Sequence, residues 1–294
     1  MLLQGAELAN EQQVFLEQLQ RVVSGLTEAV ASESGDWVIK GFIDVYQRVY
    51  ALTSDTKVVS KVLELALYPK MAEFADANGY ELILSVEQNH YPDLSFVGDD
   101  GTKYAVDMKT TYRTNGGRVN GMTLGAFTGY FRDRTSRKNT TFPYGEYAGH
   151  YVLGVIYTKM QDIPPVPTVC DLSGLASIKS VIKEFGFFAQ PKYRIASSRP
   201  GSGNTKNIGS VTLSEQLVEG TGPFAELGEQ VFDDYWMYYL TRDMARAADL
   251  PSPPYTDLVS YARYRCKCPD LNEELAARVQ AIDTGSADSA EGGE

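Results

Sequence analysis

Two carboxylates and one ammonium group lie close together along one stretch of the chain. Pro92-Asp93 is followed, with thirteen residues between the two aspartates, by Asp107-Met108-Lys109. The aspartates offer hard oxygen ligands to Mg²⁺, which needs few of them because it keeps several waters. A metal held there can activate a water and stabilise negative charge on a phosphate, and Lys109 can assist both tasks. The spacing suits metal-assisted cleavage of phosphodiester bonds.

The residues between the two aspartates predict a β-hairpin that gathers these groups. Asp93 to Val97 is short and rich in apolar residues, Gly98 to Gly101 is a turn signal, and Lys103 to Thr111 is typical of a second strand. Because side chains alternate along a strand, Asp107 and Lys109 share one face with Ala105 and Thr111, opposite Tyr104, Val106 and Met108. A surface hairpin with an ordinary salt bridge has the same spacing, so the motif alone leaves both interpretations open.

The segments around this motif are more specific than the motif itself. They are Gln88-Asn89-His90-Tyr91-Pro92-Asp93, Asp107-Met108-Lys109-Thr110-Thr111-Tyr112, Ser54-Asp55-Thr56-Lys57-Val58, Thr123-Leu124-Gly125, Gly201-Ser202-Gly203-Asn204-Thr205 and Asn207-Ile208-Gly209-Ser210. In order and spacing, from about Gly35 to about Tyr239, the chain resembles the EcoRV family of type II restriction endonucleases, which belongs to the PD-(D/E)xK nuclease superfamily. Outside the matching segments, the chain has an N-terminal helix that the family lacks and a C-terminal tail that differs from that of the family.

The resemblance implies an active site and a reaction. Asp93 and Asp107 would hold Mg²⁺, and Lys109 would assist the attacking water. Glu64 matches an acid near the active site of the family, and it would provide a second metal ligand or orient its helix. The expected reaction is hydrolysis of double-stranded DNA at a palindromic sequence, with GATATC and blunt ends giving 5′-phosphates as the implied case.

The resemblance also implies partners. A palindromic target calls for a two-fold homodimer with one active site for each strand. Residues of about 15–65 would contribute dimerisation elements, and about 80–250 would form the catalytic and DNA-binding part of one endonuclease domain spanning 1–282. A DNA methyltransferase of the same system would protect the host DNA.

The glycine-rich stretch from Ser197 to Ser210 has three interpretations. It matches neither the P-loop nor the dinucleotide fingerprint, and composition alone favours a flexible connection. The resemblance favours a loop that reads bases in the major groove, where asparagine can pair with adenine. Two groups of DNA-binding residues are therefore expected: base-reading positions Gln88, Asn89, Gly201, Ser202, Gly203, Asn204 and Thr205, and phosphate-contacting positions Thr56, Lys57, Thr110, Thr111 and Thr123.

The overall charge argues against nucleic acid, but its distribution does not. The formal net charge is −11, whereas positive charge strengthens binding to the phosphates of nucleic acid. The segment from Lys103 to Lys138 contains eight Lys and Arg residues and two acidic residues, whereas the acidic residues are in excess near the C-terminus. Residues 283–294 are expected to form a disordered tail. No apolar run is long enough to cross a membrane and no leader pattern is evident, so a cytoplasmic location is expected.

The remaining elements must position the hairpin. The sequence predicts helices over Glu11–Val30, Val58–Asn78, about Leu124–Thr135, Leu172–Phe185 and Phe224–Arg246, and strands within Trp37–Leu52, Tyr80–Val86 and Tyr147–Lys159. This order predicts an α/β fold with a mixed central sheet flanked by helices, as in restriction endonucleases. His150 is expected in the core. Two rivals remain: another nuclease of the superfamily, such as a repair enzyme or junction resolvase, and a non-catalytic DNA-binding regulator.

Overall fold

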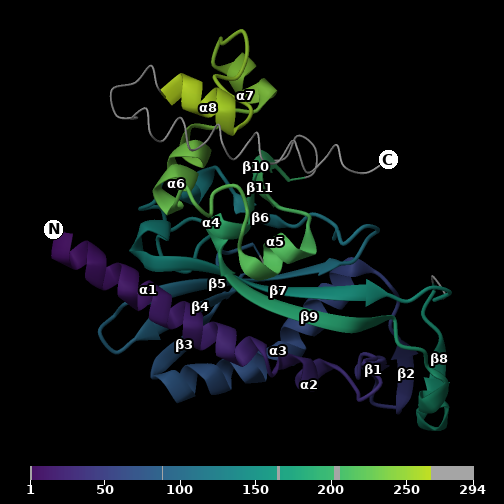
Figure 1. The fold of residues 1–294 in the computed structure, drawn as a ribbon. Helices are drawn as coiled ribbons and strands as arrows, with labels where there is room; N and C mark the ends of the chain where they lie inside the picture. Colours follow the sequence, from purple (N-terminus) through teal and green to yellow (C-terminus); the bar gives the residue numbers. More distant parts are fainter. Residues whose placement is uncertain (1, 88, 164–165, 202–205, 266–294) are drawn as a thin grey trace. The chain divides into compact units, whose positions relative to one another are not determined.

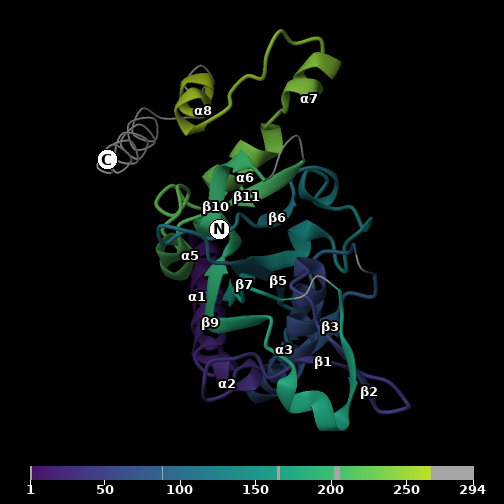
Figure 2. The same cartoon turned by 90° about the vertical axis from the view of Figure 1, so that its right-hand side faces the viewer.

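The chain forms two compact units in the computed structural model, which describes residues 2–87, 89–163, 166–201 and 206–265 (Figures 1 and 2). The first unit combines Met1–Asn120 with Tyr147–Ala189, and the second combines Gly121–Glu146 with Gln190–Glu294. Two compact units can still fold as one cooperative domain, so the single domain over 1–282 stays a prediction. The tail 283–294 lies outside the described residues.

A five-stranded sheet forms the centre of the first unit, in the order β3-β4-β5-β7-β9. Its strands are β3 (Tyr80–Leu84), β4 (Leu94–Gly98), β5 (Lys103–Tyr112), β7 (Tyr147–Lys159) and β9 (Ile182–Pro191). Neighbours are antiparallel from β3 to β5, whereas β5 and β7 are parallel. The sheet is therefore mixed, and with its flanking helices it confirms the predicted α/β fold class.

One face of this sheet carries the main core. Helices α1 (Leu2–Val23), α2 (Leu26–Val30) and α3 (Thr56–Asn78) belong to the same apolar cluster as the strands, and α1 runs across the strands in Figure 1. Phe15 of α1 is fully buried and stacks on Tyr104 of β5, with ring centroids 4.1 Å apart. Tyr104 and Val106 thus face the helices, as strand alternation predicts.

Helix α3 has a capping residue at each end. The side chain of Asp55 accepts hydrogen bonds from the backbone N–H groups of Lys57 and Val58, which caps the first turn. Gly79 ends the helix with a left-handed φ of 73°. Pro69 lies inside the helix and does not interrupt it.

A small sheet, in the order β1-β2-β8, also belongs to the first unit. It consists of β1 (Gly41–Ile43), β2 (Arg48–Ala51) and β8 (Val169–Asp171), and the 3₁₀ turn Leu172–Ser177 follows β8. The antiparallel pairing of β1 and β2 confirms the strand pair predicted within Trp37–Leu52.

The second unit contains a three-stranded sheet and short helices. The sheet order is β10-β11-β6. The strands are β6 (Thr123–Ala126), β10 (Ala196–Pro200) and β11 (Asn207–Ser210), the helices are α4 (Lys192–Ile195), α5 (Ser214–Glu219), α6 (Glu229–Tyr238), α7 (Arg242–Ala247) and α8 (Leu258–Arg265), and the 3₁₀ turns are Gly129–Phe131 and Tyr144–Glu146. Aromatic side chains around Tyr235 and Trp236 fill its interior.

Four predicted helices were wrong in whole or in part. The segment Glu11–Val30 divides into α1 and α2 at a turn formed by Ser24 and Gly25. The segment Leu124–Thr135 is strand β6 and a 3₁₀ turn, because Gly125 and Gly129 adopt positive φ and β6 pairs with β11. The segment Leu172–Phe185 is a short 3₁₀ turn followed by strand β9. The segment Phe224–Arg246 divides into α6 and α7, because the backbone is extended at Tyr239. No helix in the described ranges is long and apolar enough to cross a membrane.

Candidate active site

The β4–β5 hairpin brings the two aspartates to neighbouring positions. The last residue pair of its ladder is Leu94 with Val106, so the next residues along the two strands are Asp93 and Asp107. Asp107 and Lys109 lie two residues apart on β5 and share a face of the sheet. Beyond the end of the ladder, the carboxylate of Asp93 accepts the backbone N–H of Met108 at 2.7 Å. Strand register therefore places all three groups.

Lys109 lies between the two carboxylates. Its Nζ is 2.5 Å from Oδ2 of Asp107 and 3.8 Å from Oδ2 of Asp93. The Asp107 side chain is nearly buried, at 8% exposed, while those of Lys109 and Asp93 remain 23% and 29% exposed. The cluster is thus sheltered but open to a ligand on one side.

The electrostatics of the cluster favour bound cations. Burial and the neighbouring charge of Asp107 raise the pKa of Asp93 to about 7, although Lys109 and the Met108 N–H oppose this shift. Burial also disfavours the ammonium of Lys109, but the charges of Asp107 and Asp93 outweigh it and raise the pKa of Lys109. One lysine does not fully compensate two adjacent carboxylates.

These residues fit a hard divalent cation. The donors are carboxylate oxygens, and a second positive charge would relieve the repulsion that raises the pKa of Asp93. Within the described ranges, no set of three His, Cys, Asp or Glu side chains converges to hold a metal. Two carboxylates would nevertheless be enough to hold a small divalent cation such as Mg²⁺, which usually keeps several waters.

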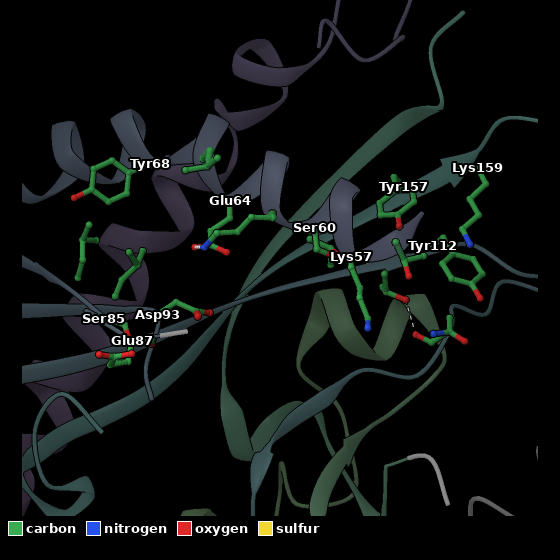
Figure 3. Close-up of a pocket in the computed structure, with 18 of the residues that line it drawn as sticks. Lys57, Ser60, Glu64, Tyr68, Ser85, Glu87, Asp93, Tyr112, Tyr157 and Lys159 are labelled. Atoms are coloured by element: carbon green, nitrogen blue, oxygen red, sulfur yellow. Dashed lines mark hydrogen bonds and ion pairs between the residues drawn. The ribbon is translucent and has the colours of Figure 1, made fainter. Parts of the chain in front are cut away.

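A cavity of about 1190 Å³ is lined by Asp93 but not by Asp107 or Lys109 (Figure 3). Helix α3 forms one wall, and strands β3, β4, β5 and β7 contribute the others. Asp93 and Glu64 lie at one end in Figure 3, while Tyr112 and Lys159 lie at the other, with Lys57 between them. The Nζ of Lys159 is 3.6 Å from the centre of the Tyr112 ring, a cation–π contact. The cavity thus continues from the carboxylates toward two lysines.

The predicted phosphate-contacting residues of the first unit line this cavity. Thr56 and Lys57 are exposed at the first turn of α3, and Thr110 and Thr111 follow Lys109 on β5. The hydroxyl of Thr110 is hydrogen-bonded to that of Ser60, while Thr111 donates to the carbonyl of Asn120. Both threonine hydroxyls therefore have protein partners, and their contact with phosphate stays a prediction.

Glu64 lies on the cavity wall with a different partner. Its carboxylate is 2.6 Å from the Nζ of Lys61 on the same helix. Its charge also helps to raise the pKa of Lys109, as the weakest of the contributions described. A supporting electrostatic role agrees with this arrangement, and a role as metal ligand stays a prediction.

The cavity also includes residues that the sequence analysis missed. They are Ser60, Lys61, Leu65, Tyr68, Leu84, Ser85, Val86, Glu87, Leu94, Tyr112, Asn120, Tyr157 and Lys159. A signal for some of them was present, because Lys57, Lys61, Glu64 and Tyr68 recur at helical spacing along one face of α3. The contribution of Lys159, at the far end of β7, requires the β5–β7 pairing that sequence periodicity does not reveal.

The predicted base-reading residues are described only in part. Asn89 is exposed in the loop between β3 and β4, whereas Gln88 lies outside the described residues. In the second unit, a Cβ on Gly201 would lie 3.0 Å from Cγ2 of Thr123, so a side chain at position 201 would crowd Thr123. Ser202, Gly203, Asn204 and Thr205 lie outside the described residues.

Comparisons with known proteins agree with this geometry. The family model described as restriction endonuclease EcoRV matches residues 33–266. The type II restriction enzyme EcoRV of Escherichia coli is 32% identical over 244 residues, which cover 82% of this chain and 96% of the relative. The matched region contains the β4–β5 hairpin and every described residue that lines the cavity.

Proposed function

The chain belongs to the EcoRV family of type II restriction endonucleases, and from this premise we propose that it cleaves both strands of a palindromic DNA sequence with Mg²⁺ as cofactor. The proposal rests above all on the convergence of Asp93, Asp107 and Lys109 at the end of the β4–β5 ladder. The proposed target is GATATC, cut at its centre to leave blunt ends with 5′-phosphates.

The roles of the three residues follow from their chemistry. Asp93 and Asp107 would hold Mg²⁺ through their carboxylate oxygens, and Glu64 would support the cluster through its charge. The bound ion would supply an activated water and would offset negative charge on the scissile phosphate. Lys109, kept protonated by its two aspartates, would orient the attacking water and stabilise the charge of the transition state.

The cavity provides a path for the DNA backbone beside these residues. Thr56 and Lys57 lie at the start of α3, where the positive end of the helix dipole favours phosphate. Lys159 adds a second positive charge along the cavity. We assign the phosphate contacts to these residues with Thr110, Thr111 and Thr123, and the base contacts to the loop around Asn89 and to the segment Gly201–Thr205.

A homodimer would present one active site to each strand. The small β1-β2-β8 sheet and the turn between β1 and β2 expose several large apolar side chains, among them Ile43 at 60% and Val45 at 91%. An apolar patch on a soluble domain commonly marks an interface. Because β1 and β2 lie within the segment expected to dimerise, we assign this sheet to the dimer contact. Ile43→Asp is expected to convert dimer to monomer in sedimentation analysis.

The cellular setting follows from the reaction. An enzyme that cuts foreign DNA acts in the cytoplasm, where the host DNA also lies. A cognate methyltransferase would be required to modify the same sequence, without any need for physical contact between the two proteins.

Plasmid digestion tests the proposed function. Purified protein with Mg²⁺ is expected to produce discrete fragments, and sequencing of their ends identifies the target and the cut position. EDTA and the Asp107→Ala variant should each abolish cleavage, while sedimentation should show that the variant keeps its oligomeric state. Cutting restricted to branched or damaged DNA would instead indicate a repair enzyme or resolvase, and binding of duplex DNA without nicking would indicate a regulator.

A further inference from the structure

A row of buried polar side chains lies next to the catalytic carboxylates on the same face of the sheet. Ser95 of β4 is paired with Ala105 of β5, which is paired with His150 of β7. The next row toward the active site contains Asp93 and Asp107. Side chains two residues apart on a strand share a face, so the Ser95–His150 row adjoins the aspartates directly. Ser95 and His150 are both buried.

Tyr91 joins this row from the loop that leads into β4. Its side chain is buried, and its hydroxyl lies 2.9 Å from Nδ1 of His150, a hydrogen bond whose donor depends on the imidazole tautomer. The Tyr91 ring also packs edge-to-face against Tyr147, whose hydroxyl is hydrogen-bonded to Ser95 at 2.8 Å. The loop before β4 is thus attached to β7, on the far side of β5.

Only Pro92 separates Tyr91 from Asp93. On one side of this short segment, the Tyr91 hydroxyl is held by His150. On the other side, the Asp93 carboxylate accepts the N–H of Met108, beyond the last β4–β5 pair. The β4–β5 ladder ends at Leu94, while on the β3 side the carbonyl of Asp93 accepts the backbone N–H of Ser85 at 3.2 Å. The two side-chain contacts add to this hydrogen bond and help to fix the direction of the Asp93 carboxylate.

We propose that His150 is a positioning residue for the nuclease reaction: by holding the Tyr91 hydroxyl, it fixes the Tyr91–Asp93 segment and keeps the Asp93 carboxylate beside Asp107 and Lys109. The consequence for catalysis rests on the proposed function, whereas the consequence for geometry does not. His150 itself touches neither metal nor DNA in this proposal. Its effect passes through Tyr91.

Four variants isolate this contact. Tyr91→Phe removes only the hydroxyl. His150→Leu removes the hydrogen-bonding atom, whereas His150→Asn keeps a polar atom at the position of Nδ1. Tyr151→Phe is the matched control, because its hydroxyl bonds to the carbonyl of Gln12 on the opposite face of the same strand, away from the aspartates.

Amide exchange at Met108 reports the geometry without any need for cleavage. In full-length protein labelled with ¹⁵N-methionine, the chain gives at most seven methionine signals, and Met108→Leu identifies the relevant one. The Met108 amide is expected to exchange about tenfold faster or more in Tyr91→Phe and His150→Leu than in the wild type, because its acceptor is no longer held in place. His150→Asn and Tyr151→Phe should stay close to the wild type.

Single-turnover cleavage of duplex DNA with Mg²⁺ reports the chemistry. Small misplacement of a catalytic group can cost up to about a hundredfold in rate, so Tyr91→Phe and His150→Leu are expected to slow cleavage by about ten- to a hundredfold. Binding of the same DNA without metal should change by less than about twofold. The double variant should be no slower than the slower single variant, because both substitutions remove one contact.

The outcomes separate this proposal from the proposed function. Faster Met108 exchange together with slower cleavage supports both. Faster exchange in a protein whose wild type never cuts DNA supports the positioning role and refutes the nuclease. Unchanged Met108 exchange in Tyr91→Phe and His150→Leu overturns the positioning role whatever the cleavage rates, and so does equal behaviour of His150→Asn and His150→Leu.

Discussion

Replacement of Asp93 by asparagine is expected to stabilise the metal-free protein above neutral pH while it abolishes cleavage. The pKa of Asp93 in the folded protein is about 7, against about 3.9 in an unfolded chain. The contribution of this group to stability is therefore full below about pH 4 and is lost as the pH rises through about 7. Asparagine carries no charge and still offers an oxygen to the Met108 N–H, so the variant does not lose this stability as the pH rises.

The size of the effect follows from the pKa. One pKa unit corresponds to about 1.4 kcal/mol, so ionising Asp93 in the fold costs at most about 4 kcal/mol. The side chain is 29% exposed, and screening by solvent moderates the penalty. We therefore expect Asp93→Asn to raise the free energy of unfolding by about 1–3 kcal/mol at pH 8, with little change at pH 4.

Urea denaturation in EDTA at the two pH values measures this difference. Asp99→Asn in the exposed β4–β5 turn is the control and should leave the pH dependence unchanged. Mg²⁺ at ten times its Kd should stabilise the wild type by about 1.4 kcal/mol and leave Asp93→Asn unaffected. If the wild type is as stable as the variant at pH 8 in EDTA, the adjacent charges do not strain the fold and the reasoning fails.

Three further substitutions test other parts of the molecule. Phe15→Ala should lower the free energy of unfolding by about 3–5 kcal/mol in urea, because it leaves a cavity among the rings of the main core. Lys57→Ala should weaken DNA binding about equally for all sequences and reduce the slope of log affinity against log salt by about 1, measured by fluorescence anisotropy. Asn204→Ala should lower discrimination between the target and a one-base variant by about 1–3 kcal/mol in competition cleavage; unchanged target choice would contradict its assigned role.

Local signals predicted the elements around the active site well. Helix α3 covers the predicted Val58–Asn78 and begins two residues earlier, at Thr56, and β7 spans the predicted Tyr147–Lys159. Alternation along β5 also correctly separated Tyr104 and Val106, which face the helices, from Asp107 and Lys109. Each of these features depends on residues within a few positions of one another.

Features that depend on distant partners could not be predicted in the same way. Strand β6 exists because Asn207 pairs with Ala126 and Gly209 with Thr123, and its own apolar residues are equally compatible with a helix. The sequence did contain a signal against a helix, because glycine has a low helix propensity. In the structure, Gly125 and Gly129 both adopt positive φ. His150 was correctly expected in the core, but its contact with Tyr91 requires the β5–β7 register that only the structure supplies.

Strand register links the stability of this protein to its chemistry. The same alternation that turns Tyr104 and Val106 toward the helices turns Asp107 and Lys109 toward the opposite face of the sheet. A one-residue slip of β5 would turn the charged groups toward the helices and the apolar groups toward the opposite face of the sheet. The packing of Phe15 on Tyr104 therefore helps to hold the register on which Asp107 depends, although the two side chains lie on opposite faces. Core substitutions that keep the register should reduce stability without altering the cleavage rate of the folded fraction, whereas any that shift it should remove activity entirely.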